Sequence, residues 1–575
     1  MKLFAIAAAA YWACLQFVYP GYFHPLYPHH DDFYFPPGLS FDGHPWSEKL
    51  HWPRPLGFLM TEVLGKAGLK GYLLILVVIT IANAALTIAL AQRIFGKPVS
   101  WFLALAYCVL LFAHPDFYVN YLHDAFGTLS YFYLILAMHA WYSYRESGGS
   151  RYLAICAFLM MAVAFTKETY FVSALVFWAA QSLLCRGTQR RASALLLGAS
   201  LILFAAGLVA NAYSMKTFLH MNIDASSAYH VSLEPAAVTS AFFFYFQLLL
   251  HPAALALMLS GIVVLYQNRE KMITAAVLLV GGICALAPYA VLPNHLDSMY
   301  AWTGASLAFS PVLFLTRTFR KPERWRTVVI YAGVALLTLI AIRTSAARYQ
   351  EHNWTIAQEK INRNIIESYP RLKATDAATK NILITGLGMP FQPFHTATYI
   401  RAEFGPERRW TVVVPKRASN KSEAPVRFEA ADTVRLGDYD AAFGFDDEGR
   451  LVWRWTHAQL AQAGTREQTD RILLPALNPI FDTLAKEPEN WTALLRAGVV
   501  YSKWGELDMA ADDLQRSAAL NHDQNPYPLY FLGQVRESQG RLDEACQLYA
   551  QAVAHDSGPS NPAFRQALER VQKSK

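Results

Sequence analysis

Apolar runs dominate the first 343 residues of this 575-residue chain. A helix that crosses a bilayer needs about 20 consecutive apolar residues, with a range near 17–25. Eleven runs reach or approach that length, at about 3–19, 71–92, 99–114, 126–143, 152–166, 170–185, 192–213, 240–267, 272–292, 301–316 and 327–343. They predict a polytopic α-helical membrane part, residues 1–343, with about eleven transmembrane helices. Met1-Lys2 before an apolar run also fits a signal peptide, but ten more spans follow, so we interpret it as an uncleaved first helix.

Charge divides the chain into two halves. Only 16% of the residues are charged, against about 25% in soluble domains. Residues 1–343 hold 22 Lys and Arg against 14 Asp and Glu, whereas residues 344–575 hold 28 against 29. The second half therefore has the composition of a water-soluble region. Because it carries no basic excess, a nucleic-acid partner is not expected.

The loops between the expected spans differ in charge. One alternate set carries fourteen cations and three acids, and its cations are Arg93, Lys97, Arg145, Arg151, Arg186, Arg190, Arg191, Arg269, Lys271, Arg317, Arg320, Lys321, Arg324 and Arg326. The other set carries eleven acids and six cations. The excess of Lys and Arg in cytoplasmic loops places the first set in the cytoplasm. With eleven spans, the amino terminus is then cytoplasmic, and the first loop (20–70) and the carboxy-terminal half lie outside, in a periplasm or a lumen.

The soluble half reads as two modules. Residues 344–470 begin as helix and continue with short β-rich runs at Asn381–Thr385, Trp410–Val414, Tyr439–Phe445 and Leu451–Trp455, which predict a small α/β module. Gly386-Leu387-Gly388 follows the first run, but the third glycine of a dinucleotide loop is missing, so a nucleotide site is not expected.

Residues 471–575 contain an internal repeat. Gly498, Gly505, Ala510 and Leu514 recur 35 residues later as Gly533, Gly540, Ala545 and Tyr549. The pattern is similar to the tetratricopeptide repeat, in which small residues let two helices pack closely. Ala497 and Arg536 depart from that pattern. Flanking helices at about 468–487 and 560–573 are expected to cap the two repeats. The module is either a packing unit or a docking surface for an acceptor.

The first outer loop holds the candidate catalytic residues. It contains His29-His30-Asp31-Asp32-Phe33-Tyr34 and later Trp52-Pro53-Arg54-Pro55-Leu56. Adjacent carboxylates after a first span, followed by Arg-Pro-Leu, resemble the GT-C superfamily of glycosyltransferases that use polyprenyl-phosphate-linked sugars. The closer resemblance is to the protein O-mannosyltransferase-like branch with tetratricopeptide repeats. It implies catalysis by the first-loop acids, transfer on the outer side, and inversion at the anomeric carbon.

These residue types suit that reaction. An acceptor hydroxyl needs a base, and Asp31 or Asp32 can take its proton, with a pKa raised by the neighbouring carboxylate. Arg54 offers a fork that matches the oxygens of a leaving phosphate. Lys167, in Phe165-Thr166-Lys167-Glu168, stands at the outer end of an expected span and offers a second cation. Against these roles, Asp31 and Asp32 also fit a solvated turn, and Arg54 also fits lipid headgroups.

Other residues complete the candidate site. Glu168 either contacts substrate or pairs with Lys167, and Asp116 or Asp124 on the next outer loop can supply a further acid. Tyr34 and Trp52 offer stacking faces for a sugar or an isoprenoid. A divalent metal is a possible cofactor, with His29, His30 and Asp32 as its ligands, although they show no fixed ligand spacing.

The sequence supports more than one function. The first is a membrane glycosyltransferase with a polyprenyl-phosphate sugar donor and a protein or glycan acceptor, in the bacterial inner membrane. An O-antigen ligase or polymerase is a second, disfavoured because the late outer loops are short. A non-enzymatic, membrane-anchored repeat scaffold for envelope glycan assembly is a third, and it leaves the Asp31, Asp32 and Arg54 group unexplained. A transporter is disfavoured because we expect no paired, broken spans.

Overall fold

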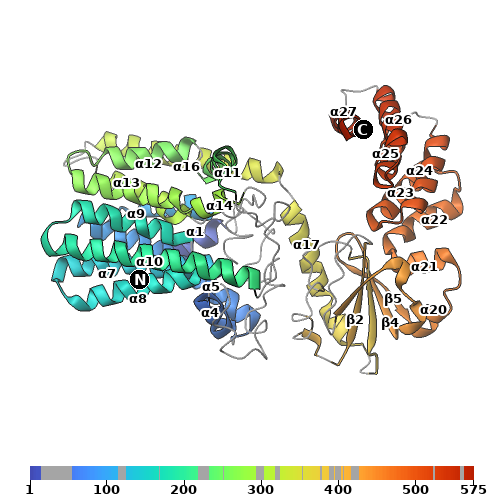
Figure 1. Ribbon diagram of the computed structural model, residues 1–575, viewed down its shortest axis with the longest axis horizontal. Helices are drawn as coiled ribbons and strands as arrows, with labels where there is room; N and C mark the ends of the chain where they lie inside the picture. The colour runs from blue at the N-terminus through green and yellow to red at the C-terminus, as the bar shows by residue number, and fades with distance from the viewer. Residues whose placement is uncertain are drawn as a thin grey trace. The chain divides into compact units, whose positions relative to one another are not determined.

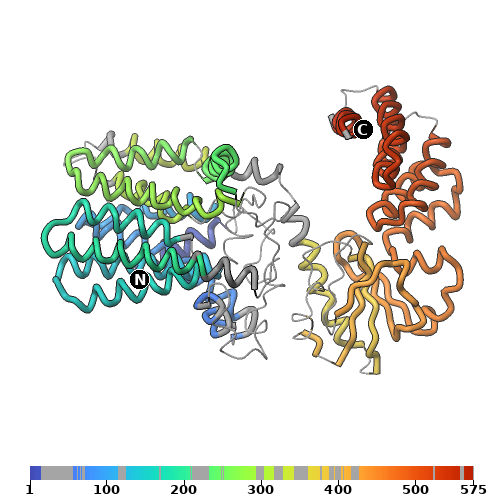
Figure 2. The backbone as a smooth tube through the Cα atoms, in the orientation of Figure 1, coloured from blue at the N-terminus to red at the C-terminus, as the bar shows by residue number. Residues whose placement is uncertain are grey.

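The chain is mostly helical, with many apolar helices and one small mixed sheet (Figure 1). The structure is a computed structural model. The structure describes residues 1–14, 55–65, 67–113, 125–167, 169–217, 232–249, 252–292, 304–317, 324–351, 354–375, 378–387, 394, 400, 403–405, 407–415, 426–521, 525–556 and 562–574. The chain divides into two compact units, Met1–Ile356 and Ala357–Lys575, which Figure 2 traces as a tube.

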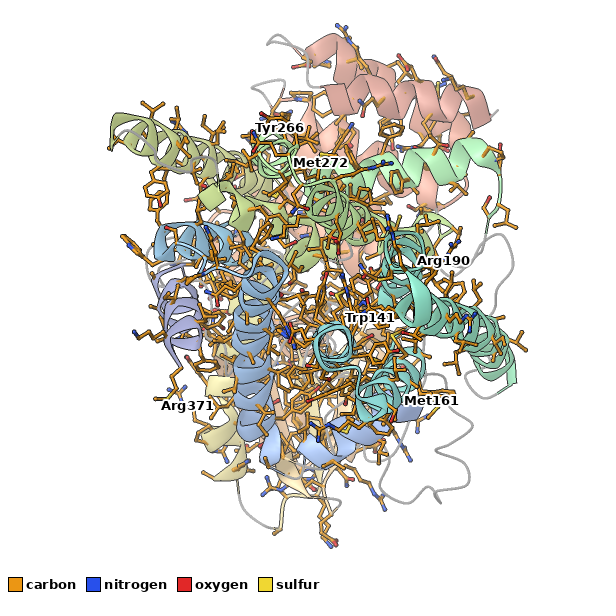
Figure 3. All side chains as sticks on the ribbon, turned by 90° about the vertical axis from the view of Figure 1, so that its left-hand side faces the viewer. Trp141, Met161, Arg190, Tyr266, Met272 and Arg371 are labelled. Atoms are coloured by element: carbon orange, nitrogen blue, oxygen red, sulfur yellow. The ribbon has the colours of Figure 1, made fainter. Side chains whose placement is uncertain are left out.

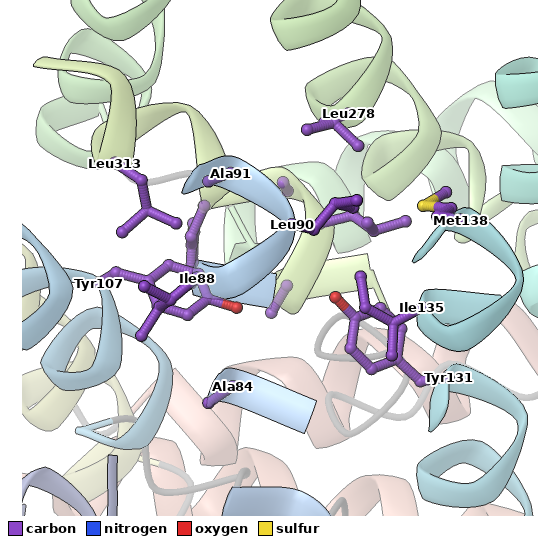
Figure 4. Close-up of a cluster of buried hydrophobic side chains, with 14 of the residues drawn as sticks. Ala84, Ile88, Leu90, Ala91, Tyr107, Tyr131, Ile135, Met138, Leu278 and Leu313 are labelled. Atoms are coloured by element: carbon purple, nitrogen blue, oxygen red, sulfur yellow. The ribbon is translucent and has the colours of Figure 1, made fainter. Parts of the chain in front are cut away.

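The first unit is a bundle of apolar helices. Its helices are α1 (Lys2–Ala13), α4 (Pro55–Gly65), α5 (Gly68–Phe95), α6 (Trp101–Phe112), α7 (Ala125–Ser147), α8 (Ser150–Thr166), α9 (Thr169–Leu184), α10 (Gly187–Thr217), α11 (Pro235–Leu249), α12 (Pro252–Val263), α13 (Arg269–Cys284), α14 (Ala287–Ala290), α15 (Ala305–Ala308), the 3-10 helix η4 (Ser310–Arg317) and α16 (Arg324–Glu351). Large side chains fill its core, and Figure 4 shows Tyr107, Tyr131 and Leu313 meeting there from α6, α7 and η4.

Fewer helices than expected have the length and apolar character of a membrane span. Among the described residues three qualify, namely Gly71–Phe95, Gly187–Gly207 and Arg269–Ala290, and a bent pair can count as a fourth. Six other apolar helices have only 10–17 residues. The expected number of about eleven spans is therefore not confirmed, although described helices occur in all eleven expected regions.

Three regions differ from the expected straight spans. The run 240–267 forms α11 and α12, which are bent by 84° from each other. Both begin at a proline, which favours the first turn of a helix. The run 301–316 forms the short α15 and then the 3-10 helix η4. Helix α4 was not expected, because eleven residues are too few for a span.

The second unit contains a five-stranded sheet. Its strands β1 (Asn381–Thr385), β2 (Arg409–Val414), β3 (Val426–Ala430), β4 (Ala441–Phe445) and β5 (Leu451–Thr456) are arranged in the order β3-β2-β1-β4-β5. Only β5 runs antiparallel to its neighbour. Asp440 fixes β1 beside β4, because its Oδ2 accepts hydrogen bonds from the N–H groups of Lys380 and Asn381, both at 2.8 Å. These bonds hold the pKa of Asp440 below its usual range.

Helices cover both faces of the sheet. These are α17 (Trp354–Glu367), α18 (Tyr369–Lys373), α20 (His457–Ala461), α21 (Arg466–Leu473), the 3-10 helix η8 (Pro475–Leu477) and α22 (Asn478–Lys486). Leu383, Val413 and Ala442 on one face join a hydrophobic cluster with α20–α22 and the repeat. On the other face, Trp410 packs against Phe394 and Phe404. The expected modules 344–470 and 471–575 thus share one core within the second unit.

The repeat consists of helical pairs. They are α23 (Trp491–Trp504), α24 (Leu507–Leu520), α25 (Tyr527–Ser538) and α26 (Leu542–His555), followed by α27 (Pro562–Ser574). Gly505 and Gly540 lie between the paired helices at φ 82° and 77°, where the 35-residue offset predicts turns. A left-handed φ is easy only for glycine, so these residues end the first helix of each pair.

Candidate functional site

Lys167 is the predicted site residue whose surroundings the structure describes. It follows α8 with an extended backbone, φ −159° and ψ 126°, and this ends the helix. Its carbonyl accepts a hydrogen bond from Ser130 Oγ of α7 at 3.1 Å. Its side chain is buried, with 4% exposed, and its Nζ lies 5.8 Å from the centroid of the Tyr289 ring. An ammonium over an aromatic face is stabilised by the ring quadrupole.

Helix α4 brings the segment after Arg54 to the same place. A Cβ added to Gly57 of α4 would lie 2.9 Å from Phe126 Cδ1 of α7 and 3.1 Å from the carbonyl oxygen of Thr166. Gly57 is three residues past Arg54, Phe126 is two past Asp124, and Thr166 immediately precedes Lys167. Three described residues, Gly57, Phe126 and Thr166, therefore lie together, and each is close in sequence to a predicted site residue. Only a glycine fits at this crossing without moving its neighbours.

Helix α14 reaches Lys167 through Tyr289, and α11 packs against α14. Tyr289 of α14 contacts Tyr245 of α11, with ring centroids 6.3 Å apart and a T-shaped geometry. Tyr245 is fully buried, and Ser232, before α11, donates its N–H to the carbonyl of Val291 at 2.9 Å. Neither Tyr289 nor α11 was predicted as part of the site. They come from segments more than 60 residues away from Lys167, and nothing in the local sequence links them to it.

Helix α7 gives the distance from this end of the bundle to the other. Phe126 and Glu146 are 20 residues apart, or about 30 Å at 1.5 Å per residue, which matches the hydrocarbon thickness of a bilayer. At the far end, Arg93 pairs with Glu146 at 2.6 Å and Arg145 pairs with Glu270 at 2.7 Å. Figure 3 looks onto the bundle from the left of Figure 1 and labels Arg190, near the start of α10.

The far end is thus a charged end. Lys271 Nζ also donates there to the carbonyl of Phe95 at 3.1 Å, and Gln189 Nε2 donates to the carbonyl of Arg145 at 3.2 Å. Arg93, Arg145 and Lys271 belong to the loop set for which the sequence predicts a cytoplasmic location. The candidate site and these cations therefore lie at opposite ends of α7.

A polar strip extends from the site into the bundle. Thr80, Asn83 and Thr87 occur at helical spacing on α5, and each is at most 4% exposed. Asn83 Nδ2 donates to the carbonyl of Thr128 at 3.0 Å, and Thr87 Oγ1 lies 2.7 Å from the Tyr131 hydroxyl. Polar residues three and four apart inside an apolar run are the sequence signal for this strip, and it was missed.

The remaining predicted residues lie outside the described residues. They are Asp31, Asp32, Arg54, Glu168, Asp116, Asp124, Tyr34, Trp52, His29 and His30. Among the residues that the structure describes, no group of three His, Cys, Asp or Glu side chains is placed to hold a metal ion. The proposed ligands His29, His30 and Asp32 are not among those residues.

One edge of the sheet in the second unit is another candidate position for a ligand. Its parallel order places Gly386, after β1, beside the end of β4, where open α/β sheets commonly bind ligands. Gly386 has φ 87°, and a Cβ on it would collide with the backbone of Phe445. In the part that the structure describes, the chain's own backbone fills this position. A comparison with protein-family models gives no match for the chain, and a comparison with curated proteins gives none either.

Proposed function

We propose that this protein is a membrane glycosyltransferase of the GT-C type, which moves a sugar from a polyprenyl-phosphate donor to an acceptor hydroxyl on the outer side of the membrane. The proposal includes about eleven spans, a cytoplasmic amino terminus and a periplasmic second unit. It is supported by the excess of cations in one set of loops and by three long apolar helices.

The observation that carries the proposal is the meeting of Gly57, Phe126 and Thr166 at one end of the bundle. Each lies within three residues of a side chain that suits the reaction, namely Arg54, Asp124 or Lys167. The proposal requires that the side chains of Arg54 and Asp124, which lie outside the described residues, reach the same substrate as Lys167. A buried lysine is costly in an apolar environment, so such a residue usually serves a function.

The reaction follows from these residue types. Asp31 or Asp32 takes the proton of the acceptor hydroxyl, and the oxygen forms a bond to the anomeric carbon. The bond from that carbon to the donor phosphate breaks, and its electron pair stays on the phosphate. Arg54 and Lys167 stabilise the charge that develops there. A single displacement of this kind inverts the anomeric centre, as the family resemblance implies.

The second unit has a place in the same proposal. Its helical pairs form a stack that suits an acceptor docking surface of the tetratricopeptide type. The repeat equally suits a scaffold without catalysis, and this is the competing function. The two differ in one respect, because a scaffold does not need Asp31 or Asp32.

The test is glycan analysis in a strain that lacks the gene. Mass spectrometry identifies the glycan that disappears, and plasmids then supply the wild type or a variant. We expect the wild type and Asp42→Asn to restore the glycan, because Asp42 is expected to be a solvated acid of the same loop. The double variant Asp31→Asn, Asp32→Asn should insert normally and restore none. Full restoration by the double variant would refute catalysis by the first loop and favour the scaffold.

A further inference from the structure

Helix α11 lies across the end of the bundle. It is bent by 84° from α12, the helix that follows it. Ser232 and Tyr245 contact Val291 and Tyr289, so both the start and the later part of α11 stay near α14. Figure 1 shows α11 nearly end-on beside α14, whereas α12 and α13 run along the bundle. Because α13 and α14 form one of the long apolar spans, α11 lies roughly perpendicular to a span, at its end.

The two faces of α11 differ. Ala241, Tyr245 and Leu249 recur every four residues and are buried. Phe242, Phe243 and Phe246 form an aromatic patch, in which the three ring centroids are 6.2–6.5 Å apart. Phe243 is 54% and Phe244 36% exposed, whereas Phe242 and Phe246 are half-buried and also pack against the core of the bundle. Pro235–Leu249 contains no Asp, Glu, Lys or Arg, so this surface offers no charge to a polar partner.

The bend excludes one straight span through α11 and α12. Helix α12 has 12 residues, or about 18 Å, and α11 has 15, or about 22 Å, against about 30 Å of hydrocarbon. The lengths of the two helices cannot be added to cross the hydrocarbon layer, because the bend between them is close to a right angle. A helix at the end of a span and perpendicular to it, with one buried face and with Phe243 exposed, has the placement of an interfacial helix, although it lacks the Lys and Arg that such helices commonly carry on a polar face.

We propose that α11 lies in the outer interface of the membrane and that its patch of Phe242, Phe243 and Phe246 contacts the upper part of the lipid acyl chains. Through Tyr245 and Tyr289 this helix then holds Lys167 at the depth of the lipid headgroups. The inference rests on the membrane placement in the proposed function, but not on the transfer reaction.

The test measures the depth of a fluorescent label on the full chain in nanodiscs. A label is attached to Phe243→Cys, with the partly exposed Cys284 and Cys546 replaced by Ala and Ser. The lipids carry bromine either near the carboxyl end or near the methyl end of the acyl chains. Ile202→Cys, at a 71% exposed position in the middle of α10, is the control for the membrane centre. Val452→Cys, at a 53% exposed position on β5, is the control for water.

We expect bromine near the carboxyl end to quench the label at residue 243 more strongly, and bromine near the methyl end to quench the label at residue 202 more strongly. The label at residue 452 should lose no fluorescence with either lipid. If residue 243 behaves as residue 202 does, α11 crosses the membrane and the proposal is wrong. If residue 243 behaves as residue 452 does, water or protein covers the patch and the proposal is also wrong. Absence of quenching at residue 202 would instead overturn the membrane placement itself, and this inference with it.

Discussion

The first helical pair depends on Gly498, and replacing this residue by alanine tests the packing. A Cβ at this position would lie 2.5 Å from Leu514 Cγ and 3.1 Å from the carbonyl oxygen of Ala510. Carbon atoms in good contact are about 3.5–4.0 Å apart, so α24 would have to move by about 1 Å. Overpacking of this kind costs about 1–3 kcal/mol, whereas Gly→Ala within a helix gains about 1 kcal/mol. We expect Gly498→Ala to lower the stability of α23 and α24 by about 1 kcal/mol.

Hydrogen exchange of the full chain in detergent measures this change, because the slowest amides of α23 and α24 report the opening of the pair. A loss of about 1 kcal/mol makes their exchange about fivefold faster. Leu514→Ala provides the internal control, since it empties the space that the new methyl group needs. In that background Gly498→Ala should be stabilising. Stabilisation by about 1 kcal/mol in both backgrounds would refute the contact between Gly498 and Leu514.

Two further predictions concern charge. Burial raises the pKa of Asp513 on α24 to about 6, above its value of 3.8 in an unfolded chain. The folded state therefore binds the proton more tightly than the unfolded state does. Its stability is expected to rise by about 2–3 kcal/mol as the pH falls from 7 to 4. In hydrogen-exchange measurements, Asp513→Asn should remove this rise in stability, and the control Asp512→Asn should leave most of it. If the stability of Asp513→Asn still rises as the pH falls, Asp513 is not the cause of the rise. For the topology, an alkaline phosphatase fused after residue 575 should be active and one fused at Arg190 inactive, and the reverse pattern would overturn the assignment of the two sides.

The sequence was informative wherever a local pattern determines the structure. Asn381–Thr385 and Ala441–Phe445 are short apolar runs bounded by polar residues, and both are strands. Gly505 and Gly540 mark turns because a helix pair needs a left-handed residue there. Strand β3 was missed because Val-Arg-Phe-Glu-Ala carries two charges and is not a continuous apolar run. That alternation suits an edge strand, which leaves one face in water.

Hydropathy could not supply the directions of the helices. The run 240–267 is apolar throughout, yet it bends near Pro252, where a proline cannot continue a preceding helix. Lys167 was identified from its position at the end of an expected span. The contact between Lys167 and Tyr289 could not be identified from the sequence, because residues 122 positions apart meet only through tertiary packing. The catalytic assignment of the acids of the first loop is based on the motif alone, since these residues lie outside the described residues.

In the proposed function, Lys167 and Arg54 bind the donor phosphate at one end of the bundle. The dissociation constant of farnesyl phosphate, a short polyprenyl phosphate, for the protein in nanodiscs tests it most directly. A charge-assisted hydrogen bond contributes about 1.5–3 kcal/mol, so Lys167→Met and Arg54→Ala should each weaken binding by about 10- to 150-fold. Arg151→Met, an exposed cation at the charged end of the bundle, should leave the constant unchanged. Wild-type binding by both the Lys167 and the Arg54 variants would contradict the account.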